Sequence, residues 1–162
     1  MSQQAEGKPV DILLVDDNPG DIRLTREALQ EGQVSSRLRV AYNGRDALAL
    51  LRQAANDANM TLPDIIFLDL NLPGMNGLEI LAEIKGDDRF RHIPVVVFST
   101  SEDDRDICRA YEHSASCYVV KQSEVEKFTE VLKSLVRLLA TGGQKGGQTG
   151  ASTQEETGSG GN

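Results

Sequence analysis

The amino-acid sequence predicts an α/β fold built on a doubly wound, five-stranded parallel sheet. Five short apolar runs recur between residues 8 and 140, and most of them are continuous rather than alternating. Continuous apolar runs are expected of strands that are covered on both faces. The segments between the runs repeat apolar residues at helical spacing, so strand and helix alternate along the chain. Such alternation is typical of a parallel sheet with helices on both faces.

The predicted strands are the five apolar runs. They span residues 12–15, 38–41, 65–68, 95–98 and 118–120. Five strands favour the flavodoxin-like order 2-1-3-4-5, with right-handed crossovers between parallel neighbours. In this order the first and third strands are adjacent, and ligands bind outside the carboxyl ends of the strands. The residues at the strand ends are therefore the candidates for a functional site.

The predicted helices follow from apolar stripes and from their terminal residues. The first should span Pro19–Glu31, because proline suits a first helical turn and Gly32 suits the stop. The other stripes comprise Ala47, Leu48, Leu51, Ala54 and Ala55; Leu78, Leu81 and Ile84; Ile107, Ala110 and Tyr111; and Val125, Phe128, Leu132, Leu135 and Leu139. The last stripe is the longest and ends before Gly142.

Composition predicts one domain, residues 9–140, between two short terminal segments. Residues 1–8 are expected to be flexible. Residues 141–162 contain eight of the 15 glycines, and Ala151 is their only hydrophobic residue. Such a segment cannot bury enough apolar surface to offset its ordering entropy, so we expect a disordered tail.

Charge and hydropathy exclude several classes of function. The net charge is −8, which argues against direct binding to nucleic acid, because phosphate backbones require clustered lysine and arginine. No apolar run approaches the roughly 20 residues that span a bilayer. The first residues lack the pattern of a signal peptide. We therefore expect a cytoplasmic protein that does not interact with membranes.

Polar residues with related chemistry follow four of the five predicted strands. Asp16 and Asp17 follow the first strand, Asp69 the third, Ser99 the fourth and Lys121 the fifth. Three carboxylates at one edge of the sheet would repel one another without a cation. Mg²⁺ suits such a site, because it prefers oxygen ligands and combines one or two carboxylates with waters and a phosphate. The pattern predicts a magnesium site with a lysine on its other side.

A cation, a lysine and a hydroxyl around one aspartate indicate phosphoryl chemistry. Asp69 is the candidate nucleophile, because a carboxylate can accept a phosphoryl group as an acyl phosphate. Mg²⁺ and Lys121 would neutralise the phosphoryl oxygens, and Ser99 could donate a hydrogen bond to one of them. Each residue also has an ordinary alternative: Asp16 or Asp17 as a helix cap, Asp69 as a turn former, and Lys121 as a solvated strand end.

Four stretches resemble the receiver domain of response regulators, the CheY-like family. They are ILLVDDNPGD, IIFLDLNLPGMNGLEIL, IPVVVFSTSE and YVVKQSE, in the order acids, aspartate, serine, lysine. The resemblance covers about residues 9–140. Finer features, such as DNPGDIRLTREAL, are similar to stand-alone regulators that partner bacterial phytochrome histidine kinases.

This resemblance implies that the protein acts in a two-component phosphorelay. Asp69 would take a phosphoryl group from a sensor histidine kinase, a bacterial phytochrome being one candidate. Mg²⁺ would be held directly by Asp17 and Asp69, by the backbone carbonyl of Asn71, and by Asp16 mainly through water. The protein would be a phosphoprotein that catalyses only its own phosphorylation and slow dephosphorylation, and not an enzyme acting on other substrates.

The resemblance also implies a conformational switch. Ser99 would move to the phosphoryl group and Tyr118 would rotate inward, changing the face formed by the helix near residues 107–111, the strand 118–120 and the last helix. No output domain is expected after residue 140, so signal output would require a downstream protein. The last helix also offers Val131, Val136 and Leu138 outside its main stripe, which leaves a homodimer open.

One residue departs from the family pattern. The family usually has a proline after the lysine, commonly with a cis peptide bond, whereas this chain has Gln122 after Lys121. A cis bond before another residue costs about 2.5–4 kcal/mol, so we expect a trans bond or a strained cis bond.

Three other functions compete with the phosphorelay. A Mg²⁺-dependent phosphatase with an aspartyl-phosphate intermediate would need a general acid two residues after Asp69, where Asn71 cannot serve. A flavin or nucleotide carrier would need a glycine-rich first loop, and the residues here are acidic. A receiver-like interaction module that works without phosphorylation remains the main alternative.

Overall fold

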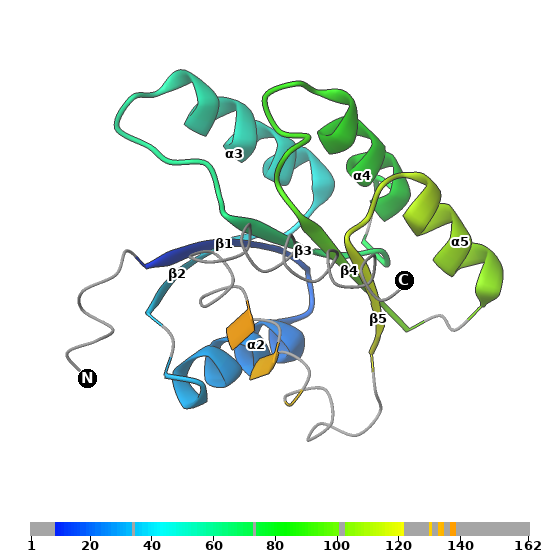
Figure 1. Ribbon diagram of the computed structural model, residues 1–162, viewed down its shortest axis with the longest axis horizontal. Coiled ribbons are helices and arrows are strands. Elements are labelled where there is room, and N and C mark those ends of the chain that lie inside the picture. Colours follow the sequence, from blue (N-terminus) through cyan, green and yellow to red (C-terminus); the bar gives the residue numbers. More distant parts are fainter. Residues whose placement is uncertain are drawn as a thin grey trace, which may run out of the picture.

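The computed structural model describes residues 9–33, 35–72, 74–100, 103–121, 130, 133–134 and 137–138 (Figure 1). Its elements are β1 (Val10–Val15), α2 (Pro19–Glu31), β2 (Ser36–Ala41), α3 (Gly44–Asn56), β3 (Ile65–Asp69), α4 (Gly77–Gly86), β4 (Val95–Ser99), α5 (Asp104–Glu112) and β5 (Cys117–Val120). Among the described residues, none of the helices has the length and hydrophobicity that a membrane span requires.

The sheet has the predicted topology. Its five strands are all parallel and lie in the order β2-β1-β3-β4-β5. Each strand is one or two residues longer than its apolar run. The largest difference, two residues, is at the start of both β1 and β2, where Val10 and Asp11 pair in register with Ser36 and Arg37. Pairing with the neighbouring strand, rather than hydrophobicity, sets where β2 begins.

Both faces of the sheet are covered, which explains the continuous apolar runs. Helices α3, α4 and α5 lie on one face and α2 lies on the other (Figure 1). Along β1, Leu13 and Val15 belong to the core beneath α3, α4 and α5, whereas Ile12 and Leu14 belong to the core beneath α2. Because successive side chains of a strand point to opposite faces, every residue of β1 from Ile12 onward is buried in one core or the other.

Asparagine side chains cap three of the described helices, and Asn43 at the start of α3 accepts a hydrogen bond from the N–H of Asp46 (2.8 Å). The Asn18 side chain accepts hydrogen bonds from the backbone N–H groups of Gly20 (2.8 Å) and Asp21 (3.2 Å). Asn76 and Glu79 form a capping box at the start of α4. The cap of α2 is therefore Asn18, and the alternative in which Asp16 or Asp17 serves as the cap is wrong.

Several predictions concern residues outside the described ranges. These include the terminal segments 1–8 and 141–162, the Lys121–Gln122 peptide bond, and Val131 and Val136. The described peptide bonds include no cis bond. Residues 130, 133–134 and 137–138 are helical, in agreement with a helix in this region, and the side chain of Leu138 is exposed.

Gly77 lets the start of α4 pack against the residues that follow β3. A Cβ atom at this position would lie 2.6 Å from Leu70 Cα and 3.1 Å from the carbonyl oxygen of Asp69. These are backbone atoms, so the chain itself would have to move. We expect Gly77→Ala to lower the free energy of unfolding by about 1–3 kcal/mol, measured by urea denaturation.

The matched control lies at the other end of the same helix. A Cβ atom at Gly86 would have no atom within 4 Å, and alanine favours a helix over glycine. Gly86→Ala should leave the free energy of unfolding unchanged or slightly higher. Equal losses in the two variants would contradict the role given to the contact between Gly77 and Leu70.

Candidate functional site: an acidic cluster with a buried lysine

The carboxyl ends of β1 and β3 bring three aspartates together. Asp16 and Asp17 directly follow β1, and Asp69 is the last residue of β3. One carboxylate oxygen from each of the three lies within 4.8 Å of the others. Asp16 and Asp69 are each only 3% exposed, whereas Asp17 is exposed to solvent. The structure thus assembles the predicted acidic cluster, with two buried members and one member open to water.

Backbone N–H groups orient the two buried carboxylates. Asp16 Oδ1 accepts a hydrogen bond from the N–H of Asn18 (2.9 Å), and Asp69 Oδ1 accepts one from the N–H of Asn71 (2.9 Å). The main chain at Asp16 is itself fixed, because its N–H donates to the carbonyl of Ala41 at the end of β2 (3.0 Å). The second oxygen of each carboxylate is therefore directed away from these turns and toward Lys121, which approaches both.

Lys121, which directly follows the edge strand β5, brings a positive charge to this cluster. Its backbone N–H donates to the carbonyl of Ser99 (2.7 Å), which continues the pairing of β4 with β5. Its ammonium Nζ lies 3.1 Å from Asp69 Oδ2 and 3.7 Å from Asp16 Oδ2. The Lys121 side chain is 13% exposed, so the alternative of a solvated lysine at a strand end is wrong.

A third carboxylate, outside the three-aspartate cluster, contacts the same ammonium. Asp21 Oδ2 lies 2.6 Å from Lys121 Nζ, which makes it the shortest of the three contacts. Asp21 is in the first turn of α2 and did not stand out in the sequence, because an acidic residue there is ordinarily explained by the helix dipole. No local pattern relates it to a residue 100 positions further along the chain.

The electrostatics of the cluster favour a bound cation. Burial raises the pKa of Asp16 to about 7, and the nearby charges of Asp69 and Asp21 add to this effect, although the Asn18 hydrogen bond and Lys121 oppose it. Burial lowers the pKa of Lys121, but its hydrogen bond with Asp21 and the neighbouring carboxylates outweigh burial and raise it. Lys121 is thus charged and does not fully compensate the acids. A hard dication with oxygen ligands fits this donor set.

The structure also locates the predicted switch residues. Ser99 is 1% exposed at the end of β4, and it lies opposite Val120 in β5. Tyr118 is half-buried and packs against the core beneath α3, α4 and α5. Its backbone N–H donates to the hydroxyl of Tyr111 on α5 (3.1 Å). A hydrogen bond from the main chain of β5 to a side chain of α5 therefore connects these two elements.

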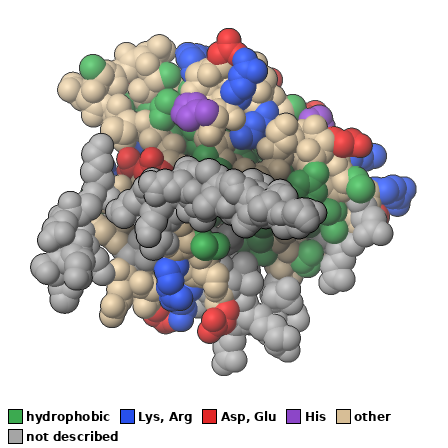
Figure 2. Space-filling view, in the orientation of Figure 1, with side chains coloured by type: hydrophobic (Ala, Val, Ile, Leu, Met, Phe, Trp, Pro, Cys, Tyr) green, Lys and Arg blue, Asp and Glu red, His purple; other side chains and the backbone are tan. Residues whose placement is uncertain are grey.

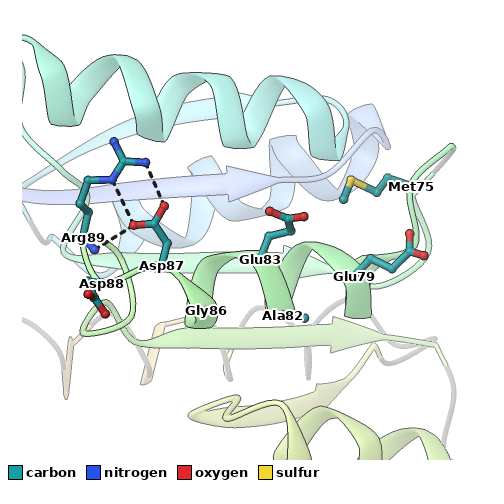
Figure 3. A pocket seen from close by; sticks show the side chains of 8 residues that line it. All are labelled: Met75, Glu79, Ala82, Glu83, Gly86, Asp87, Asp88 and Arg89. Carbon is teal, nitrogen blue, oxygen red and sulfur yellow. Dashed lines mark hydrogen bonds and ion pairs between the residues drawn. The ribbon is translucent and has the colours of Figure 1, made fainter.

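A separate surface depression lies along α4 and the turn that follows it (Figure 3). It is lined by Met75, Glu79, Ala82, Glu83, Gly86, Asp87, Asp88 and Arg89. Its charges are largely paired among themselves and with neighbours, as in the bidentate contact of Arg89 with Asp87 (2.9 and 3.0 Å). None of these lining residues belongs to the acidic cluster, so the depression offers no comparable chemistry.

Comparison with known proteins identifies the family. The model of the response regulator receiver domain matches residues 12–133, and the chain belongs to this family of signalling proteins. The curated relatives include the response regulator Rcp1 of Synechocystis sp., which is 36% identical over 127 residues that cover 78% of this chain and 86% of Rcp1.

Solved structures narrow the class further, to relatives of phytochrome response regulators. The phosphorylated cyanobacterial phytochrome response regulator RcpA has a TM-score of 0.76 and 40% identity, over 82% of this chain and 95% of that chain. The Mn²⁺-bound form of Rcp1 has a TM-score of 0.72 and 36% identity, over 78% and 91% of the two chains. The bacteriophytochrome response regulator AtBRR has a TM-score of 0.64 and 38% identity, over 78% and 92%.

Proposed function

We propose that this response regulator accepts a phosphoryl group on Asp69 from the phosphohistidine of a sensor kinase. The observation that carries the proposal is the position of Asp69 Oδ2, which faces the Lys121 ammonium at 3.1 Å beside two further aspartates. An acyl phosphate formed there would have a fixed positive charge on one side and a cation site on the other. This is the arrangement that phosphoryl transfer requires.

The transfer would use the groups that orient Asp69. The N–H of Asn71 holds Oδ1, which leaves Oδ2 to attack phosphorus while the phosphorus–nitrogen bond of the phosphohistidine breaks. The Lys121 ammonium would then pair with the negatively charged phosphoryl oxygens, and the Ser99 hydroxyl would donate a hydrogen bond to one of them. The imidazole leaves with the electron pair of the broken bond and takes a proton from solvent.

The same residues would hold Mg²⁺. Asp17 and Asp69 would bind it directly, together with the backbone carbonyl of Asn71, and Asp16 would bind it mainly through water. When bound, the ion would neutralise part of the charge on the transferring group. The Mn²⁺-bound form of the relative Rcp1 supports a divalent ion, and the oxygen-only donor set supports Mg²⁺ in particular.

Phosphorylation would change the conformation of β5 and of the neighbouring helix α5, and this change would be the output signal. Movement of Ser99 toward the phosphoryl group would open space for Tyr118, whose backbone is bonded to Tyr111 on α5. Tyr111 is 49% exposed, and hydrophobic, basic and acidic side chains are mixed over α5 in Figure 2. This face would bind a downstream protein, and the exposed Leu138 would be available to a homodimer contact.

The relatives favour a particular kind of kinase. RcpA and AtBRR are described as phytochrome and bacteriophytochrome response regulators, so the kinase here would be a bacterial phytochrome. Such a pair would operate in the cytoplasm. Apart from its own phosphorylation and dephosphorylation, the protein would catalyse no reaction.

Intact-mass measurement tests the phosphoacceptor directly. With Mg²⁺ and acetyl phosphate, the wild-type protein should gain one phosphoryl group, and Asp69→Asn should gain none, because an amide oxygen is too weak a nucleophile to form the acyl phosphate. Asp64→Asn is the matched control, since Asp64 is an exposed aspartate before the same strand. The absence of an adduct with both acetyl phosphate and a cognate kinase would leave the phosphorylation-independent interaction module as the function.

A further inference from the structure

The ammonium of Lys121 is shared between the proposed phosphoacceptor and a residue of α2. Nζ lies 2.6 Å from Asp21 Oδ2 and 3.1 Å from Asp69 Oδ2. The Lys121 side chain is 13% exposed and that of Asp21 is 20% exposed, so both charges are largely removed from water. Their attraction is therefore screened less than that of a surface ion pair.

Asp21 is presented from a rigid helical turn. Its backbone N–H donates to the side chain of Asn18 (3.2 Å), and its carbonyl accepts from the hydroxyl of Thr25 (2.9 Å). It does not belong to the three-aspartate group that could hold a cation, which comprises residues 16, 17 and 69. Asp21 thus contacts the lysine without belonging to the proposed metal site.

We propose that Asp21 is a positioning residue that restrains Lys121 and thereby opposes phosphorylation of Asp69. This inference rests on the proposed function. A phosphoryl group on Asp69 needs N–H donors from Lys121, and the Asp21 carboxylate competes for the same ammonium. The Asp21 charge also repels the phosphoryl oxygens directly. Both effects favour the unphosphorylated protein and keep phosphorylation dependent on a strong donor.

The charge of Asp21 has the opposite effect on a cation. Within the unphosphorylated cluster, an additional carboxylate attracts Mg²⁺, and its hold on Lys121 draws the competing positive charge away from Asp16 and Asp69. Neutralising Asp21 should therefore weaken the binding of Mg²⁺ and strengthen the binding of a phosphoryl group. Damage to the fold of α2 would weaken the binding of both Mg²⁺ and the phosphoryl group. Opposite changes in the two affinities therefore distinguish a positioning role from a structural one.

Calorimetric titration of beryllofluoride, a phosphoryl mimic, measures both quantities. Mg²⁺ is titrated first, and beryllofluoride is then titrated at saturating Mg²⁺. We expect Asp21→Asn and Asp21→Ser to bind beryllofluoride about three- to tenfold more tightly than wild type and Mg²⁺ about two- to fivefold more weakly. Two different neutral replacements are used, so that the measurement can still be made if one of the variants does not fold.

Two further variants serve as controls. Asp21→Glu retains the charge and should bind both ligands as wild type does. Glu27→Gln removes one charge from an exposed position on the same helix and should also match wild type.

The outcomes separate this inference from the proposed function. If wild type binds no beryllofluoride and gains no phosphoryl group, the proposed function of Asp69 is wrong. If wild type binds beryllofluoride and the neutral Asp21 variants bind it equally or more weakly, the function stands and the restraining role of Asp21 is wrong. Weaker binding of both ligands would assign Asp21 to the stability of α2.

Discussion

Replacing Lys121 with methionine should slow phosphoryl transfer from acetyl phosphate by roughly 10²- to 10³-fold, the usual cost of removing one donor to a developing oxyanion. Methionine keeps the length and the apolar stem of the side chain but removes the ammonium that lies 3.1 Å from Asp69. Time-resolved intact mass at saturating Mg²⁺ provides the measurement. The same variant should bind Mg²⁺ more tightly, because a positive charge leaves the edge of the cation site.

The substitution should also destabilise the Mg²⁺-free protein. Lys121 lies against three carboxylates, two of which are buried, and removing one partner of a buried ion pair costs about 3 kcal/mol or more. Lys133→Met is the matched control, because Lys133 pairs with Glu31 at a distance of 3.0 Å at a more exposed site. That surface pair should contribute at most about 1 kcal/mol. Similar losses in the two variants would contradict a buried and functional ion pair at Lys121.

The Mg²⁺-free protein should lose stability as the pH rises. Asp16 has a pKa of about 7 in the folded protein, mainly because it is buried, and a value near 3.9 when unfolded. Between these values the folded state binds a proton that the unfolded state does not, so raising the pH favours unfolding. The free energy of unfolding should be about 2 kcal/mol lower at pH 8 than at pH 5.5, measured by urea denaturation with a chelator present.

Neutralising Asp16 or adding Mg²⁺ should remove most of this slope. Asp16→Asn cannot titrate, and a cation favours the charged carboxylate at both pH values. Asp46→Asn, which changes an exposed aspartate of α3, should keep the wild-type slope. Any contribution of the two histidines to the pH dependence of unfolding is the same in all these proteins. The difference in slope therefore arises from Asp16. Equal slopes in Asp16→Asn and wild type would show that Asp16 is ionised throughout this range.

The predictions from sequence succeeded where the governing pattern is local. Continuous apolar runs identified strands buried on both faces, and apolar residues at helical spacing identified the helices between them. The parallel order then placed Asp16, Asp69 and Lys121 at one edge, because the carboxyl ends of parallel strands meet there. The response regulator family follows from these same stretches of sequence.

The sequence by itself therefore determined the fold, the family and two of the three acids that contact Lys121, Asp16 and Asp69. Only the tertiary structure decided how the charges are paired, because it places Asp21 closer to the Lys121 ammonium (2.6 Å) than Asp69 (3.1 Å). The physical reason is the separation of the interacting residues along the sequence. Periodicity and strand ends are properties of neighbouring residues, whereas the distance between two side chains 100 positions apart depends on how α2 packs against the sheet.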